Sequence, residues 1–350
     1  MRIIDLFSGV GGLTFGFYYR KYKDHFVRNR KNQFVFANEY NPLAAKAYSE
    51  NYPDIPMKNC DIKSLKESDI KEWIGSEPVD LMIGGPPCQS FSTVGQRNYD
   101  EKAQLYTEYL RVLKIARPKM FLFENVRGIL SMREIFYKRD AAGNILYELK
   151  DVEGRESLTP RKKPVIDHYG KSVMEILNDQ FSNLGNGLGY NIWTERLNAM
   201  DYGVPENRER VFIVGIRNDL NLKWNCPPKE KSAHLTIKDA ISDLPEVLEG
   251  QSISSYQQLP QNKYQELMRH GSNELTQHFC GCYSEKIRAV IQHVKQGEGK
   301  NEFNALVDSG KIDKSYRLTS GYANTYGRLI ADQPSPTITN NLTTVSSLRC

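Results

Sequence analysis

The chain has 350 residues, 39% of them hydrophobic, which is enough for one large domain and a smaller one around a sizeable core. No apolar run approaches the roughly 20 residues that cross a bilayer, so the sequence predicts no membrane helix. Met1 leads directly into a strand-like segment, which argues against a signal sequence. The expected location is the cytoplasm. The net charge of +5 is compatible with a polyanionic partner but decides little alone.

Short apolar runs recur along the first part of the chain and predict strands at 2–7, 34–37, 79–83, 120–123 and 211–216. Between them, Asn41 can cap a helix that starts at Pro42, with a buried stripe predicted at Leu43, Ala44, Ala47 and Tyr48. A second helix is predicted over 105–116. Strands that alternate with helices predict a doubly wound α/β sheet, whose ligands bind at the carboxyl ends of the strands.

Residues 131–170 break this alternation. They contain a turn signal at 140–144 and a basic cluster at Arg161, Lys162 and Lys163, and we expect an inserted surface excursion.

After about Arg217 the alternation fades into a polar region that is interrupted by prolines at 227, 228, 245 and 260. This change predicts a catalytic domain at 1–222 and a second domain at 223–350.

The six cysteines, at 60, 88, 226, 280, 282 and 350, have no regular framework spacing, so free thiols are expected. Cys280 and Cys282 form a C-x-C pair near His278, but no second close pair completes a tetrahedral set. The sequence therefore predicts no metal site.

A glycine turn follows the first predicted strand. Asp5 to Leu13 read DLFSGVGGL, a strand end, a tight turn and a helix start that let a ligand approach the backbone closely. The spacing differs from G-x-G-x-x-G and does not favour the pyrophosphate of NAD. Glu39, after the second strand, can accept the hydroxyls of a ribose, and Asp61-Ile62 offers an acceptor and an apolar surface for an adenine. A plain glycine turn and an exposed loop acid stay open as alternatives.

A second glycine-rich segment carries a cysteine. Gly84 to Ser92 read GGPPCQSFS directly after the strand predicted at 79–83, and the two prolines stiffen the chain just before Cys88. A lone cysteine is usually a buried, inert thiol. Polar surroundings at the carboxyl end of a strand favour a functional thiol here.

In their order along the chain, these segments resemble the motifs of a known family. Together with Glu124-Asn125-Val126 and Glu206-Asn207-Arg208-Glu209-Arg210, they are similar to those of the cytosine-C5 DNA methyltransferases of bacterial restriction-modification systems. The resemblance covers about 1–220 and resumes at 326–329 and 334–339, which are similar to the end of the family's target-recognition region. It implies a Rossmann-like catalytic domain that uses S-adenosylmethionine, followed by a smaller target-recognition domain.

The resemblance also implies the methyl donor's contacts. S-adenosylmethionine would leave as S-adenosylhomocysteine, and the residues that match the family's cofactor motifs are Asp5, Phe7, Ser8, Gly9, Gly11, Gly12, Leu13, Glu39, Asp61, Ile62, Pro86 and Leu105.

Four catalytic residues are implied in the same way. Cys88 would add to C6 of cytosine, because C5 is too electron-poor to attack a methylsulfonium until the ring becomes an enamine. Glu124 would hydrogen-bond N3 and the exocyclic amine and supply a proton as negative charge builds. Arg210 would hold O2 of the base and favour the ionised thiol, and Arg208 would hold the neighbouring backbone or loop.

One position departs from the family pattern. The family usually has Gln where this chain has Glu206. An acid there adds negative charge near Arg208 and Arg210, which either weakens phosphate contact or holds the arginines in place.

Other segments are expected to bind the substrate, double-stranded DNA. A stacked cytosine is inaccessible, so the base must leave the helix, and residues 89–104 resemble the family's mobile loop, with Ser90, Ser92, Gly95 and Arg97. The region 223–328 would read the flanking sequence, although no side chain there can be assigned to a base. Among its basic residues and interleaved tyrosines are Arg269, Lys286, Arg288, Lys314, Arg317, Tyr316, Tyr322 and Tyr326.

Two other functions stay open. One branch of the family methylates transfer RNA with the same Cys and Glu, although the Pro334 to Thr337 stretch resembles bacterial DNA enzymes. A purely DNA-binding homologue would normally lack Cys88 or Glu124, and both are present.

The expected partners follow from the same resemblance. In the family two further motifs follow the segment that matches 334–339, and one of them closes the methionine side of the cofactor pocket. The chain is therefore expected to be truncated, or to be the DNA-binding subunit of a split enzyme that needs a second subunit. Alone, it would bind the cofactor poorly and turn over little. A cognate restriction endonuclease is expected in the same system.

Overall fold

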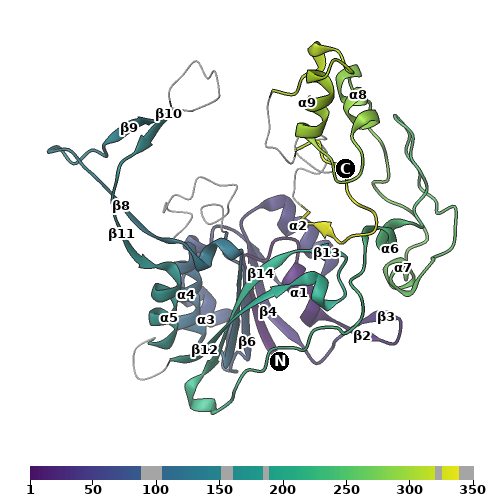
Figure 1. Ribbon diagram of the computed structural model, residues 1–350. Helices are drawn as coiled ribbons and strands as arrows, with labels where there is room; N and C mark the ends of the chain where they lie inside the picture. Colours follow the sequence, from purple (N-terminus) through teal and green to yellow (C-terminus); the bar gives the residue numbers. More distant parts are fainter. Residues whose placement is uncertain (88–104, 151–160, 184–188, 320–324, 339–350) are drawn as a thin grey trace. The chain divides into compact units, whose positions relative to one another are not determined.

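The computed structural model describes residues 1–87, 105–150, 161–183, 189–319 and 325–338 (Figure 1). The chain divides into two compact units. The first consists of Met1–Arg20, Val27–Leu197 and Glu209–Cys226, and the second of Lys21–Phe26, Asn198–Arg208 and Pro227–Cys350.

A seven-stranded sheet forms the centre of the first unit. Its strands are β1 (Arg2–Leu6), β4 (Gln33–Glu39), β5 (Met57–Asn59), β6 (Leu81–Gly84), β7 (Met120–Asn125), β12 (Tyr190–Asn198) and β14 (Glu209–Arg217). The order across the sheet is β12-β14-β7-β6-β1-β4-β5, with parallel pairing from β7 to β5, and β14 antiparallel to β7. The predicted strands and the α/β class are confirmed.

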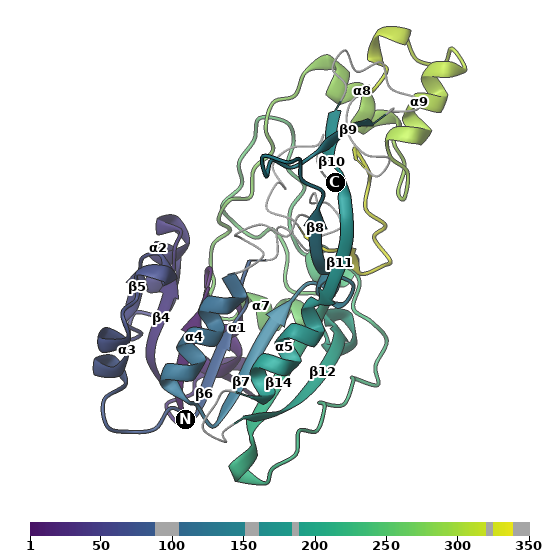
Figure 2. The ribbon, with the colours of Figure 1, turned by 90° about the vertical axis from the view of Figure 1, so that its left-hand side faces the viewer.

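Helices cover both faces of this sheet (Figures 1 and 2). They are α1 (Gly12–Tyr18), α2 (Pro42–Asn51), α3 (Glu67–Ile74), α4 (Tyr106–Ala116) and α5 (Val173–Ser182), with short 3-10 turns η1 (Ile62–Ser64), η3 (Arg127–Leu130) and η5 (Asn218–Leu220). Alternate residues of a strand enter different cores: Ile4 and Leu6 pack with α3, α4 and α5, whereas Ile3 packs with the tyrosines of α1 and α2. This alternation makes the sheet doubly wound.

The strand order contains a switch point. From β1 the chain proceeds outward through β4 to β5 and then crosses to β6 and β7 on the other side of β1. Crossovers diverge there, and open α/β sheets bind their ligands at the carboxyl ends of the strands beside such a point, here β1 and β6. The predicted site residues follow these strand ends.

The predicted helix cap at Asn41 is confirmed. Its side chain accepts hydrogen bonds from the backbone N–H groups of Leu43 and Ala44, 2.9 and 3.2 Å away, and Pro42 occupies the first helical position. The predicted buried stripe is partly wrong, because the side chain of Leu43 is 78% exposed and the buried positions are Ala45 and Tyr48. The helix is rotated so that its tyrosine enters the core.

The excursion at 131–170 is an antiparallel ribbon. Strand β8 (Arg133–Tyr137) pairs with β11 (Ile166–Ser172), and β9 (Tyr147–Lys150) pairs with β10 (Arg161–Pro164). The turn predicted at 140–144 is confirmed, since the Asp140 N–H donates to the Asn144 carbonyl and the Asp140 carboxylate accepts from the Asn144 N–H, both at 2.9 Å.

The regular structure in the described part of the second unit is mostly helical. It contains α6 (Ile237–Ile241), α7 (Lys263–Arg269), α8 (Glu285–His293), α9 (Lys300–Asp308), the turns η4 (Ala199–Tyr202) and η6 (Lys314–Tyr316), and the parallel pair β13 (Glu206–Asn207) and β15 (Ser335–Pro336). A short hairpin, β2 (Tyr19–Tyr22) and β3 (His25–Arg28), precedes β4 in sequence. The hydrophobic core of the second unit contains Val290, Val294, Phe303, Val307 and Leu318.

Among the described residues, no helix is long and apolar enough to cross a membrane. Within the same ranges, no three His, Cys, Asp or Glu side chains gather in a way that could hold a metal ion.

Candidate active site

The glycine turn after β1 is held against the end of β4. The Ser8 N–H donates to the Asn38 carbonyl at 3.0 Å, and the Gly9 N–H donates to Oε2 of Glu39 at 2.8 Å. Phe7 and Gly9 have φ values of 55° and 56°, in the left-handed region that strains any residue other than glycine. A Cβ added to Gly9 would meet no described atom within 4 Å, so among the described residues the turn presents bare backbone.

A glycine is required at position 11 because a side chain there would collide with Tyr52. Its φ is 94°, and a Cβ there would lie 2.1 Å from the Tyr52 ring, whose hydroxyl donates to the Gly11 carbonyl at 2.9 Å. Tyr52 thus packs directly on the turn and fixes its shape.

Glu39 connects the first two predicted cofactor motifs. One carboxylate oxygen accepts from the Gly9 N–H and the other from the Asn41 N–H at 2.7 Å. A carboxylate has about four acceptor sites, so both oxygens can still accept a ligand hydroxyl. The next residue, Tyr40, is 74% exposed, which places a bare aromatic ring at this edge of the sheet. The sequence reasoning missed Tyr40, although its place directly after Glu39 could have indicated it.

Asp5 is buried beneath the turn. Its carboxylate accepts from the Thr14 hydroxyl, which lies 2.9 Å from the Tyr48 hydroxyl. Burial raises the pKa of Asp5 to about 7; the Thr14 hydrogen bond opposes this rise and the charge of Glu39 adds to it. Oδ1 of Asp5 and Oγ of Ser8 are both buried and have no hydrogen-bond partner among the described residues. Unpaired buried polar atoms at a turn are a sign that a ligand or water belongs there.

The Asp5 carboxyl gives the fold a testable pH dependence. Its pKa in the folded state is about 7 and its ordinary value is 3.8, so between these values the folded chain holds a proton that the unfolded chain has lost. The contribution of Asp5 to stability is therefore greatest below pH 4 and is lost as the pH rises through 7. We expect Asp5→Asn to gain stability relative to the parent between pH 5 and pH 7, by on the order of 2 kcal/mol. Thermal melts across this range would measure it, and parallel curves would contradict it.

Glu124 and Arg210 meet at the carboxyl end of β7. The register of β7 with β14 pairs Phe212 with Glu124, and the Nε of Arg210 lies 2.8 Å from Oε1 of Glu124. The side chain of Arg210 is 18% exposed and that of Glu124 is 24% exposed, so this ion pair is partly shielded from solvent yet open to a ligand. A guanidinium beside a carboxylate presents both a donor and an acceptor to a planar polar ring.

The neighbouring strand end is fitted to this ion pair. A Cβ added to Gly85, just after β6, would lie 2.8 Å from Oε2 of Glu124. The Asn125 side chain is buried and donates to the Pro86 carbonyl at 3.3 Å, while its own oxygen accepts from the Val126 N–H. Gly85 and Asn125 thus bring the segment that leads to Cys88 beside Glu124. The sequence reasoning assigned neither residue a role.

Cys88 itself lies outside the described residues, as does the predicted mobile loop 89–104. The described segment before Cys88 ends at Pro87, which is exposed, while Pro86 is buried. The role of Cys88 stays a prediction.

The remaining predicted cofactor residues differ in how far they are exposed to solvent. Asp61 is exposed and caps η1 by accepting from the Lys63 N–H at 2.9 Å. Ile62 is 3% exposed and packs in the core, so its side chain offers little of the apolar surface expected for an adenine. Leu13 and Leu105 are partly buried against the two cores, and Gly12 has open space around its missing Cβ. Their contacts with a cofactor stay predictions.

Arg208 belongs to the second unit. Its backbone N–H donates to the Asn198 side chain at 3.0 Å, and its guanidinium lies 3.7 Å from Oε1 of Glu206. The same Glu206 oxygen accepts from the Ile338 N–H at 2.8 Å, and β13 pairs with β15. The acid at the usual Gln position therefore has a local use: it ties the segment after Pro334 to β13.

If Glu206 holds the backbone of Ile338, then Glu206→Gln and Glu206→Ala should differ in stability. Glu206→Gln keeps an oxygen that can accept from Ile338, so we expect little change in stability. Glu206→Ala removes the acceptor and should cost about 1.5 kcal/mol, with faster amide hydrogen exchange around Ile338. Exchange measured by mass spectrometry on both variants tests this, and equal behaviour of the two would show that the acceptor is unimportant.

Several basic residues named for DNA reading have structural partners in the second unit. Arg269 pairs with the buried Asp243 at 3.2 Å and lies over the Tyr256 ring, and Arg288 makes a two-pronged contact with Glu249. Tyr322 lies outside the described residues.

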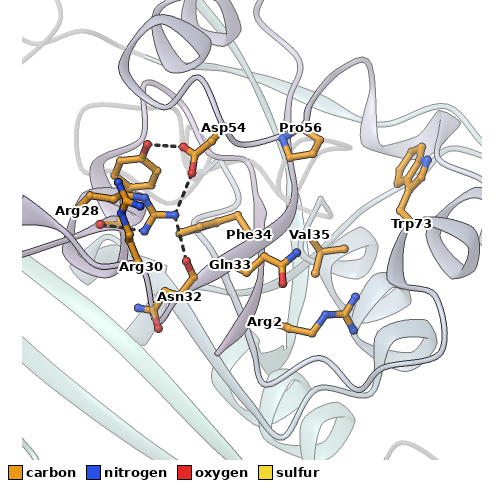
Figure 3. Close-up of a pocket in the computed structure, with 11 residues that line it drawn as sticks. Arg2, Arg28, Arg30, Asn32, Gln33, Phe34, Val35, Asp54, Pro56 and Trp73 are labelled. Atoms are coloured by element: carbon orange, nitrogen blue, oxygen red, sulfur yellow. Dashed lines mark hydrogen bonds and ion pairs between the residues drawn. The ribbon is translucent and has the colours of Figure 1, made fainter.

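A cavity of about 750 Å³ opens at the amino ends of β1 and β4 (Figure 3). The Arg28 guanidinium donates to the Asn29 and Asn32 carbonyls at 2.6 and 3.1 Å and pairs with Asp54, and Arg2 donates to the Ile74 carbonyl at 2.6 Å. These arginines stabilise the loops at this edge of the sheet. The cavity lies at the opposite ends of the strands from Glu39 and Glu124.

Comparisons with known proteins agree with the motif order. A family model described as C-5 cytosine-specific DNA methylase matches residues 1–152 and 163–342. The type II methyltransferase M.DdeI of Desulfomicrobium norvegicum is 34% identical over 305 residues, covering 85% of this chain and 62% of that protein. The type II methyltransferase M.AgeI of Thalassovita gelatinovora is 33% identical over 354 residues, covering 92% of this chain and 70% of that protein.

A solved structure shares the fold. It is described as a DNA modification methyltransferase encoded within a prophage of E. coli, with a TM-score of 0.61, 23% identity, and coverage of 96% of this chain and 82% of that chain. The present chain spans less than two thirds of the length of M.DdeI, since it covers 62% of that protein.

Proposed function

This chain belongs to the C-5 cytosine-specific DNA methylase family, and we propose that it transfers a methyl group from S-adenosylmethionine to C5 of a cytosine in duplex DNA. The observation that carries the proposal is the Glu124–Arg210 ion pair, with the Gly85–Pro87 segment held beside it. Cys88 follows that segment directly in the sequence.

The proposed chemistry uses these residues in turn. The Cys88 thiolate adds to C6 of a base that has left the duplex, which places electron density on C5. Glu124 takes up a proton from solvent and passes it to N3 as negative charge builds on the ring, and takes it back when the thiolate leaves; Arg210 donates hydrogen bonds to O2. After the methyl group has moved, a base removes the C5 proton and the thiolate leaves. The ion pair supports this assignment because it holds both groups at one strand end, 2.8 Å apart.

The described residues at the glycine turn fit S-adenosylmethionine. In the part of the chain that the structure describes, nothing lies against the Cα of Gly9, and Oδ1 of Asp5 and Oγ of Ser8 have no hydrogen-bond partner. Glu39 retains acceptor sites. We propose that Glu39 accepts the ribose hydroxyls and that Tyr40 lies against the adenine. When bound, the cofactor supplies an electrophilic methyl group. Asp61, Pro86 and Leu105 belong to the same proposed site.

This cofactor site predicts a selective loss of affinity. Glu39→Gln replaces a charged acceptor by a neutral one and leaves an oxygen for the Gly9 N–H, so we expect about ten-fold weaker cofactor binding with unchanged DNA binding. Titration calorimetry measures the first quantity and fluorescence anisotropy the second. Lys46→Gln, at an exposed position on α2, is the control for a surface change. Unchanged cofactor affinity in Glu39→Gln would show that the ribose contact is misplaced.

A methyl-transfer assay tests the function. Labelled S-adenosylmethionine is incubated with the chain and either mixed-sequence duplex DNA or transfer RNA, and the labelled base is identified. We expect 5-methylcytosine in the DNA, and label in the RNA alone would favour the transfer RNA alternative. The assay is run with and without the downstream reading frame supplied in trans, which also tests the expected second subunit. Loss of label from both nucleic acids under both conditions would refute the function.

The biological setting is part of the proposal. Its relatives include type II methyltransferases, which supports a role in a restriction-modification system with a cognate endonuclease in the bacterial cytoplasm. Bisulfite sequencing of DNA from cells that express the chain would identify the methylated sequence.

A further inference from the structure

The positive charge of the chain is concentrated in one short segment, residues 20–31, which we call the basic hairpin. It contains one acid, Asp24, and six basic side chains, which are Arg20, Lys21, Lys23, Arg28, Arg30 and Lys31. The whole chain has 47 basic and 42 acidic residues, so the rest of the chain carries 41 of each. The net charge of +5 is therefore the charge of this segment alone.

The basic hairpin is packed at its root and at its tip. Strands β2 and β3 pair with each other, and the Asn29 N–H donates to the Tyr18 carbonyl at 2.8 Å. The Arg28 guanidinium lies over the Tyr18 ring, 3.8 Å from its centroid. At the tip, the ring of His25 stacks on that of His270, with centroids 4.6 Å apart, and both residues belong to the second unit. The segment is thus a built part of the fold.

Most of its cations face solvent. Five of the six are exposed, and they are Arg20, Lys21, Lys23, Arg30 and Lys31. The sixth, Arg28, is half-buried and pairs with Asp54 at 3.1 Å. Like charges this close along the chain repel one another, and Asp24 is the one acid within the segment. A bound polyanion would remove this repulsion.

The turn of the hairpin carries a lysine where a smaller residue would be less strained. Lys23 has a φ of 54°, in the left-handed region that glycine and asparagine occupy most easily in hairpin turns. Its neighbour Tyr22 is 47% exposed, so an aromatic ring lies among the cations. The lysine gives the turn no conformational advantage, and what it adds there is charge.

The root of the basic hairpin lies at the amino end of the central sheet. Lys31 is two residues before β4, at the end where β1 and β4 begin. Arg28 and Arg30 line the cavity of about 750 Å³ at this end (Figure 3). Glu39 and Glu124 lie at the opposite, carboxyl ends of their strands. The charge excess is therefore not part of the pocket proposed for the target base.

We propose that the basic hairpin binds the phosphates of a second DNA segment, separate from the segment whose cytosine enters the candidate active site. The exposed side chains here are cations around one aromatic ring rather than an apolar face, which favours DNA over a protein partner. This inference rests on the proposed function, since that function brings DNA to the protein as its substrate. A second contact with the same long DNA raises the local concentration of target sites at the active site.

Two matched triple variants test the proposal. The first removes three exposed charges of the basic hairpin by Lys21→Gln, Lys23→Gln and Lys31→Gln. The control removes three exposed lysines of α3, α4 and the residue before α3 by Lys66→Gln, Lys71→Gln and Lys114→Gln. Both variants lose the same charge, and thermal melts establish that each is folded.

The first measurement is the number of short duplexes that one chain binds. A duplex of about 12 base pairs is roughly 40 Å long and too stiff to bend back from one end of the sheet to the other. In sedimentation at low salt, the parent and the control should bind two such duplexes per chain. The hairpin variant should bind the second about ten-fold more weakly, with a slope of log affinity against log salt that is smaller by up to about 2.7.

The second measurement compares methylation of long and short DNA. On a plasmid at limiting concentration, the hairpin variant should be about five-fold slower than the parent, because the tethering contact is weakened. On the short duplex at saturation, the parent, the variant and the control should have the same rate. A variant that had merely lost stability would be slower on both substrates, which would contradict the proposal.

The outcomes separate this inference from the proposed function. If the parent methylates DNA but binds one short duplex per chain, or if the hairpin variant binds two as tightly as the control, the inference alone is overturned. It is overturned equally if the variant keeps both duplexes and instead loses a dimer in sedimentation, since the hairpin would then contact protein. If the parent methylates no DNA, with or without the downstream reading frame, the proposed function has failed, whatever the number of bound duplexes.

Discussion

Replacement of Cys88 by alanine is expected to abolish methyl transfer to DNA, by roughly 10⁴-fold or more, while DNA binding and the fold are retained. The thiolate provides the covalent step that makes C5 of cytosine nucleophilic, and a methyl side chain provides nothing in its place. Glu124 and Arg210 would still bind the base, which is why affinity should survive. Single-turnover methylation with labelled cofactor measures the loss.

Cys226→Ala is the matched control for this substitution. Cys226 is an exposed thiol, so its removal should leave the rate unchanged. Methylation that persists in Cys88→Ala, with the Cys226 variant as reference, would mean that the chain uses another nucleophile or another reaction.

Gly85→Ala is expected to reduce methyl transfer about 100-fold with little loss of stability. The new Cβ would lie 2.8 Å from Oε2 of Glu124, closer than a methyl group tolerates, and the end of a flexible side chain is what gives way. The carboxylate would turn away from Arg210 and from the position of the base, and misplacement of a catalytic group by about 1 Å can cost about 100-fold in rate. The turnover number and the melting temperature, measured together, test the prediction.

A second glycine provides the control. Gly16 lies within α1, has no positive φ, and would meet nothing within 4 Å if it carried a Cβ. Gly16→Ala should therefore leave the rate near that of the parent and the fold as stable or slightly more so. An unchanged rate in Gly85→Ala would show that the observed position of the Glu124 carboxylate is unimportant for catalysis.

Much of the fold could be predicted from local patterns. The strands at 2–7, 120–123 and 211–216 are visible as apolar runs because helices cover both faces of the central sheet and bury them, and Asn41 with Pro42 is a strong helix start. Short or polar elements gave no such signal: β5 has three residues, and β12 is an edge strand of mixed polarity. The ribbon at 131–170 is predicted as an excursion but not as strands, because no described side chain from Arg133 to Gly170 is buried and no alternation marks it.

The candidate site was predictable in its residue types but not in its contacts. Glu124 and Arg210 are 86 positions apart in sequence, and only the pairing of β7 with β14 brings them together. The fit of Gly85 against Glu124 and the clamp of Asn125 on Pro86 depend on backbone positions that a motif does not reveal. The sequence also gave no sign that Glu206 would accept from Ile338, a bond that forms only once β13 and β15 pair.

Covalent trapping is the most direct test of the central claim that Cys88 attacks a cytosine. Duplex DNA that contains 5-fluorocytosine in place of cytosine is incubated with the chain and S-adenosylmethionine, and the adduct is digested and mapped by mass spectrometry. After methyl transfer the fluorine cannot leave as a proton would, so the thioether should persist and map to Cys88. An adduct at another residue, or active methylation of ordinary DNA with no adduct on the fluorinated duplex, would contradict the account.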